Sequence, residues 1–131
     1  GVMAIYNAPL AQPDHTLRAV RSALAIQEAV KDIHSELPPE NCLHFGIGIT
    51  SGLAVVGSIG STKIRNYTAI GDTVNLASRL QAQAEPGQVL VDKAAYGHLK
   101  DRIIARELGY VQVKGHSEPD LVFEVLGLEE A

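Results

Sequence analysis

A strand-like run that turns at a Gly-Asp pair and continues directly as a helix is the feature that most constrains this fold. Residues 65–70 predict the strand, and Gly71-Asp72 follows them without a linker. The helix is expected over residues 73–84, with Asp72 as the N-cap that accepts from the free amide groups of the first turn. Residues 85–87, Glu-Pro-Gly, then end the helix, because proline cannot continue it.

The N-terminal part of the chain predicts a buried strand followed by a long helix. Residues 2–6 are an apolar run that ends at the turn-forming Asn7-Ala8-Pro9. Because this run starts abruptly at residue 1, we expect the chain to be a piece of a longer protein. The helix is expected to begin after Asp14 and to end at Pro38-Pro39. Its predicted buried face carries apolar residues at spacings of four and three: Ala19, Ala23, Ile26, Val30, Ile33 and Leu37.

The remaining elements mix hairpins with helical crossovers. Residues 43–50 and 53–59 are two β-type runs joined at Ser51-Gly52, which predicts a hairpin. Asp92 is the expected N-cap of a short helix over residues 92–99. This mixture favours an α+β fold, a mainly antiparallel sheet with helices packed on it, over a doubly wound parallel sheet. Further strands are predicted at residues 88–91, 103–113 and 121–126.

Composition narrows the class of protein. The 131 residues fit one domain, and a hydrophobic content of 46% supports a packed core. The net charge of −4, spread over mixed signs, gives no basic stripe for nucleic acid and no polybasic membrane anchor. No apolar run approaches the length of a membrane span, so cytoplasmic surroundings are expected. Cys42 is the single cysteine and closes no intrachain disulfide, and the histidines are scattered without metal-ligand spacing: His15, His34, His44, His98 and His116.

Three side chains of the strand and helix suit a phosphorylated ligand. Asn75 and Arg79 are four residues apart on the predicted helix, so their side chains emerge on the same face. Thr68 lies on the strand that feeds this helix. A guanidinium is permanently charged and donates two parallel hydrogen bonds, which fits a phosphoryl group. Helix geometry alone leaves open that Arg79 is a solvated helix arginine and Asn75 a first-turn capping residue.

The amino-acid sequence of the strand, turn and helix also resembles that of a known family. Residues 67–80, YTAIGDTVNLASRL, closely resemble the signature of class III adenylate and guanylate cyclases, in which strand, Gly-Asp turn and helix run in this order. Nearly the whole chain takes part in the resemblance, and bacterial adenylate cyclases are the most similar members. The other segments that are similar to the family, in the family's order, are residues 14–30, 46–61, 85–91 and 111–126.

The resemblance implies a role for each matching residue. Asn75 would orient the ribose, and Arg79 would neutralise charge on the α-phosphate as the 3′-hydroxyl attacks and pyrophosphate leaves. Thr68 matches the purine-reading position, where its hydroxyl accepts a hydrogen bond from the adenine N6 amino group. Ala69 would offer backbone contacts to the same ring edge. Lys114 would contact the β- and γ-phosphates, and a structural lysine at a strand end is the alternative for it. ATP is therefore the implied substrate, with cyclic AMP and pyrophosphate as products.

Two divalent metal ions, Mg²⁺ or Mn²⁺, are also implied, with no ligand in this chain. Family members hold these ions with two aspartates, whose motifs would both lie before residue 1. We therefore expect residues 1–131 to be the C-terminal two thirds or so of a ferredoxin-like cyclase domain, without its N-terminal strand and helices, and to be inactive alone. The aspartates of this chain that stand in neither motif are Asp14, Asp32, Asp72, Asp92, Asp101 and Asp120.

The family also implies partners for the parent protein. We expect a head-to-tail homodimer, in which metal aspartates of one subunit meet Thr68, Asn75 and Arg79 of the other, and a fused sensor or regulatory domain serving signal transduction. Three alternatives stay open. They are a guanylate cyclase, a degenerate regulatory domain that binds nucleotide without chemistry, and a small α+β interaction module with an accidental resemblance.

Overall fold

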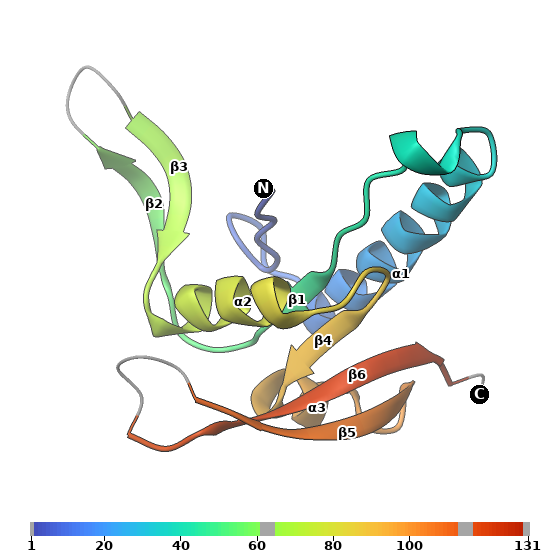
Figure 1. Cartoon of the computed structure of the whole chain (residues 1–131). Coiled ribbons are helices and arrows are strands. Elements are labelled where there is room, and N and C mark those ends of the chain that lie inside the picture. Colours follow the sequence, from blue (N-terminus) through green and yellow to red (C-terminus); the bar gives the residue numbers. More distant parts are fainter. Residues whose placement is uncertain (1, 61–64, 113–116, 130–131) are drawn as a thin grey trace.

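The computed structural model describes residues 2–60, 65–112 and 117–129. These residues form three α-helices, one 3₁₀ turn and six strands, joined by loops (Figure 1). Their bounds, in chain order, are α1 (His15–His34), η1 (Pro39–Asn41), β1 (Ile47–Ile49), β2 (Val55–Gly60), β3 (Arg65–Ile70), α2 (Asp72–Gln83), β4 (Val89–Asp92), α3 (Lys93–Leu99), β5 (Ile103–Val111) and β6 (Asp120–Leu128).

The strands form two sheets. Four of them pair in the order β1-β4-β6-β5, where β1 and β4 run parallel and the other two pairings are antiparallel. Strands β2 and β3 form a separate antiparallel sheet that projects from the rest of the molecule beyond one end of α2 (Figure 1). This arrangement confirms the predicted α+β class with a mostly antiparallel sheet. It also means that β2 and β3 reach the main sheet only through the segments that flank them.

Helices cover both faces of the four-stranded sheet. Successive residues of a strand point to opposite faces, and Val89 and Val91 of β4 belong to the core cluster of α1 and α3, whereas Leu90 lies in a second cluster. That second cluster joins Leu90 and Val122 to Leu76 and Leu80 of α2. Strand β4 is therefore buried on both sides, with α1 and α3 on one face and α2 on the other.

The predicted strand over residues 2–6 is wrong. These residues have no regular secondary structure, Val2 is fully exposed, and the Met3 side chain is 51% exposed. A strand is stable only when a neighbour satisfies its backbone groups, and none of the described strands pairs with this run. An apolar pattern shows that a segment suits a sheet, but it does not show that a partner strand is present.

Helix α1 buries a different face from the one predicted. Of the predicted stripe only Ala23 is buried, whereas Ile26 and Ile33 are about half exposed. The helix also ends at His34, before the prolines. Its second half extends past the edge of the sheet (Figure 1), so the apolar residues there have no sheet to cover. The buried residues come from the first two thirds of the helix: Thr16, Leu17, Val20, Ala23 and Gln27.

The predicted hairpin over residues 43–59 is also wrong. Strand β1 pairs with β4 in the main sheet, whereas β2 pairs with β3. The residues around Ser51-Gly52 therefore cross from one sheet to the other instead of reversing the chain. The bounds of β3 match the prediction, but the predicted β1 is shortened to three residues.

The three aspartates expected at helix starts differ in what they do. Helix α1 begins directly after Asp14, as predicted, and Asp14 occupies the N-cap position, but its carboxylate makes no capping hydrogen bond. It accepts a hydrogen bond from Arg18 Nε at 2.7 Å, which lowers the pKa of Asp14. Gly71, not Asp72, is the N-cap of α2, and Asp72 lies inside the first turn. Asp92 does cap α3, because its Oδ1 accepts from the Ala95 amide at 2.9 Å.

Asp92 gives the fold a pH dependence. The residue is 7% exposed, and this burial raises the pKa of its carboxyl, although the amides of Ala95 and Ser51 oppose the shift. An unfolded aspartate ionises near pH 3.9. As pH rises from there through the higher native pKa, the unfolded state loses its proton first, so ionisation of Asp92 disfavours the folded state.

We expect Asp92→Asn to keep the capping oxygen and remove this charge. The free energy of unfolding of Asp92→Asn relative to the unchanged protein should rise as pH increases from about 4 and then level off. Asp92→Ala removes the cap as well and should lose about 0.5–2 kcal/mol at low pH. Urea unfolding at several pH values measures both, with the exposed Asp101→Asn as control. A relative stability of Asp92→Asn that falls with rising pH would contradict the account.

Candidate active site on β3 and α2

The predicted strand, turn and helix form one continuous unit. Thr68 pairs with Gly57 along the β2–β3 ladder, and Ala69 pairs with Val56. Gly71 ends the strand with φ at +135°, a region that favours glycine. Its carbonyl accepts from the amides of Val74 and Asn75, each at 3.1 Å, which starts α2. The chain therefore passes from the strand of Thr68 into the first turn of α2 with no intervening loop.

Helix α2 is fixed to the sheet by its apolar side. Leu76 is 4% exposed and Leu80 is completely buried, and both contact Leu90 and Val122 of the sheet. Asn75 and Arg79 each precede one of these leucines, so they lie about 100° further round the helix. Both are exposed. Burial of the two leucines thus sets the rotation of α2 that presents the amide and the guanidinium to solvent.

Two glycines of β1 and its lead-in allow the helix to lie so close. A Cβ added at Gly48 would lie 2.5 Å from the carbonyl oxygen of Ala77 and 2.6 Å from the amide nitrogen of Gln81. One added at Gly46 would lie 2.3 Å from Ala84 Cβ. Any side chain at either position would push α2 away from the sheet.

The structure brings some of the predicted site residues together and leaves others undecided. Asn75 and Arg79 share the exposed side of α2, and Ala69 is 6% exposed at the end of β3. The side chain of Thr68 and all of Lys114 lie outside the described residues. In the part of the chain that the structure describes, the Arg79 guanidinium has no ion pair. An exposed cation of this kind is available to an anionic ligand.

The described residues do not provide a metal centre. No group of three or more His, Cys, Asp or Glu side chains among them could hold a metal ion. Histidines that are distant in sequence do approach in pairs, with ring centroids 6.0 Å apart for His15 and His98 and 4.8 Å apart for His34 and His44. Sequence spacing gave no signal for these pairs. His116 lies outside the described residues.

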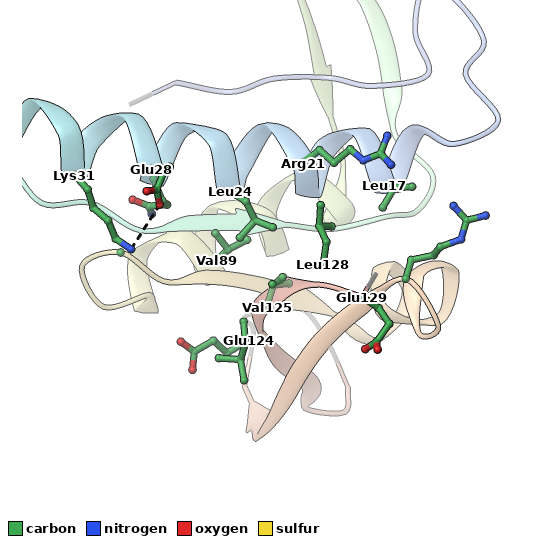
Figure 2. A pocket seen from close by; sticks show the side chains of 15 residues that line it. Leu17, Arg21, Leu24, Glu28, Lys31, Val89, Glu124, Val125, Leu128 and Glu129 are labelled. Carbon is green, nitrogen blue, oxygen red and sulfur yellow. Dashed lines mark ion pairs between the residues drawn. The ribbon is translucent and has the colours of Figure 1, made fainter. Parts of the chain in front are cut away.

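A hollow of about 1040 Å³ lies elsewhere, between α1 and β6. Leu17 and Leu24 of α1 face Val125 and Leu128 of β6 across it (Figure 2). Neither Asn75 nor Arg79 lines this groove or the smaller hollow beside α3. Asn75 and Arg79 are instead exposed on the surface of α2. No helix of the described residues is both long and apolar enough to cross a membrane.

Comparison with known proteins identifies the family. The family model for the adenylate and guanylate cyclase catalytic domain matches residues 2–125. Adenylate cyclase 1 of Rhizobium meliloti is 38% identical over 134 residues, which cover 99% of this chain and 20% of that protein. This chain therefore belongs to the family of adenylate and guanylate cyclase catalytic domains.

Solved structures agree with the family and with the fold. The adenylyl cyclase CyaB from P. aeruginosa matches with a TM-score of 0.83 and 30% identity over 92% of this chain. The guanylyl cyclase Cya2 matches with a TM-score of 0.84 and 32% identity over 95% of this chain. In both comparisons the match spans 64% of the solved chain, so the present chain corresponds to part of each.

We expect Gly48→Ala to weaken the seating of α2. Its Cβ would meet backbone atoms of α2, which cannot move aside without shifting the helix. The free energy of unfolding in urea should fall by about 1–3 kcal/mol. Gly127→Ala in β6 is the matched control, because a Cβ there meets nothing within 4 Å. Equal stability of the two variants would show that α2 does not depend on this contact.

Proposed function

We propose that the protein containing this chain is an adenylate cyclase that converts ATP to 3′,5′-cyclic AMP and pyrophosphate in signal transduction. The observation that carries this proposal is the continuous β3–Gly71–α2 unit, in which Asn75 and Arg79 are exposed while two buried leucines hold the helix on the sheet. Membership of the cyclase family and the name of the Rhizobium relative support the reaction class. In this proposal, residues 1–131 are part of one cyclase catalytic domain.

The proposed reaction is an internal phosphoryl transfer. The 3′-oxygen of the ribose attacks the α-phosphorus, the bond from that phosphorus to the bridging oxygen of pyrophosphate breaks, and the 3′-hydroxyl proton passes to water. Negative charge develops on the phosphoryl oxygens, and a fixed cation stabilises it. Arg79 would donate to the α-phosphate oxygens, while Asn75 would hold the ribose so that the 3′-oxygen stays in line.

Recognition of the base rests on β3. The Thr68 hydroxyl would accept a hydrogen bond from the adenine N6 amino group, and the backbone of Ala69 would contact the same ring edge. Lys114 would add charge near the β- and γ-phosphates. These three assignments come from the family pattern, since their contacts lie in or beside residues that the structure does not describe.

Two Mg²⁺ or Mn²⁺ ions belong to the proposal, but the described residues do not fit them. They contain no cluster of three metal-ligating side chains. We therefore assign no step of the reaction to a metal held by this chain, and we expect the ligands to come from residues upstream of it. A head-to-tail homodimer, in which a second subunit brings those ligands to the exposed Asn75 and Arg79 of α2, is part of the proposal.

A guanylate cyclase is the second candidate function. The guanylyl cyclase Cya2 matches this chain as well as the adenylyl cyclase CyaB does, so overall similarity does not separate the two substrates. A regulatory cyclase-like domain without chemistry is the third, because the described residues lack a metal-binding cluster. The ratio of kcat/KM for ATP to kcat/KM for GTP distinguishes an adenylate cyclase from a guanylate cyclase. The presence or absence of two metal-binding aspartates upstream of this chain distinguishes an enzyme from a regulatory domain without chemistry.

Arg79 tests the proposed chemistry. We expect Arg79→Ala in the full-length protein to lower kcat for cyclic AMP formation by about a hundredfold to a thousandfold, as for loss of one charge-stabilising donor. Arg79→Lys should recover only part of the rate, because an ammonium cannot make two parallel hydrogen bonds. Gln83→Ala, an exposed change on the same helix, is the control. Near-normal cyclic AMP production by Arg79→Ala would exclude the role given to Arg79.

The isolated chain tests the assignment of the metal ligands. Residues 1–131 alone should form no cyclic AMP from ATP in Mg²⁺ or Mn²⁺, because the proposed ligands lie outside them. The full-length protein assayed beside it is the positive control. Turnover by the 131-residue chain would refute this assignment and require ligands within the chain.

A further inference from the structure

Two threonine hydroxyls connect the segment that enters β2 to the first turn of α2. Thr50 Oγ1 donates to the carbonyl of Thr73 at 2.7 Å, and Thr73 Oγ1 donates to the carbonyl of Leu53 at 2.8 Å. Both threonines lie in segments that resemble the family, but the resemblance assigned no role to either hydroxyl. The two bonds run in opposite directions across the same junction, so each of the two segments both donates and accepts.

This junction is where the two halves of the candidate site meet. Thr68 and Ala69 lie on β3, whose two-stranded sheet stands apart from the main sheet, whereas Asn75 and Arg79 lie on α2. Leu76 and Leu80 pack in a cluster with Leu90 and Val122 of the main sheet, which fixes the rotation of α2 on that sheet. The direct covalent link between the halves is Gly71, the residue type with the greatest conformational freedom.

The surroundings of Thr73 are shaped to hold its hydroxyl. A Cβ added at Gly52 would lie 2.6 Å from Thr73 Oγ1, so only glycine leaves room for this contact. The Leu53 carbonyl oxygen also lies 3.8 Å from the place of a Cβ on Gly71, which puts the acceptor directly beside the turn. Thr73 thus ties α2 to the backbone that leads into β2, two residues before Val55, which pairs with Ile70.

We propose that Thr73, supported by Thr50, is a positioning residue that sets the base-reading strand β3 relative to the ribose- and phosphate-binding helix α2. It touches neither the nucleotide nor the reacting atoms, and this inference rests on the function proposed above. Its hydroxyl prevents the Gly71 junction from flexing. A nucleotide whose purine binds β3 then has its ribose beside Asn75 and its α-phosphate beside Arg79. Misplacement of about 1 Å can lower a rate a hundredfold.

The test is a set of threonine variants in the full-length protein, assayed with ATP and with GTP. Thr73→Val keeps the shape and removes the hydroxyl; kcat should fall about tenfold to a hundredfold, and discrimination between the two nucleotides should fall with it. Thr73→Ser restores the hydroxyl and should return both quantities to within about threefold of the unchanged protein. A purely stabilising role would alter the melting temperature and leave the discrimination ratio unchanged.

Matched variants separate this role from loss of fold. Gly52→Ala should reproduce Thr73→Val, because it displaces the hydroxyl without removing it. Thr16→Val is the control, since Thr16 is 6% exposed on α1 and its hydroxyl contacts only His15 among the described residues. It should lower stability without moving the ratio. If Thr73→Val does not fold, kcat and the discrimination between ATP and GTP are measured in Gly52→Ala and Thr50→Val, and these two variants test the positioning role instead.

The outcomes distinguish this inference from the function on which it rests. Normal kcat and normal discrimination in Thr73→Val would overturn it, as would a Thr73→Ser variant as impaired as Thr73→Val. If Arg79→Ala is inactive while Thr73→Val is normal, the function stands and the positioning role fails. If Arg79→Ala stays active, the site on α2 and the positioning role both fail.

Discussion

The close contact between α2 and strand β1 at Gly48 sets where the helix lies on the main sheet. A side chain there would collide with backbone atoms of Ala77 and Gln81, so the helix lies directly on the strand. From that position Leu76 and Leu80 reach Leu90 and Val122. Because α1 and α3 cover the opposite face of β4, that strand is buried on both sides, and Asn75 and Arg79 remain on the outward side of α2.

Local patterns predicted the elements whose structure is local. The bounds of β3 and the capping of α3 by Asp92 depend on neighbouring residues, and both predictions were confirmed. The strand at residues 2–6 and the hairpin at residues 43–59 depend on partners distant in the sequence, and both predictions were wrong. The prediction of the buried face of α1 was wrong for the same reason, because the spacing of apolar residues does not show where the sheet ends.

The candidate site was predictable only through the family pattern. Spacing placed Asn75 and Arg79 on one side of a helix, but a solvated surface pair has the same spacing. The structure adds what spacing cannot, namely two buried leucines that fix which side faces out. It also adds Thr50 and Thr73, whose hydroxyls bond across 23 and 20 residues of sequence and leave no periodic signal. Lys114 lies outside the described residues, so its role stays a prediction.

A crystal structure of the complete domain with a non-hydrolysable ATP analogue would show which residues hold the nucleotide. The proposed site requires that Arg79 donates to oxygens of the α-phosphate, that Asn75 contacts the ribose, and that the purine lies against β3 of the same subunit. An analogue whose phosphates are held by other residues, with Arg79 facing solvent or the ligand bound in the groove between α1 and β6, would contradict it.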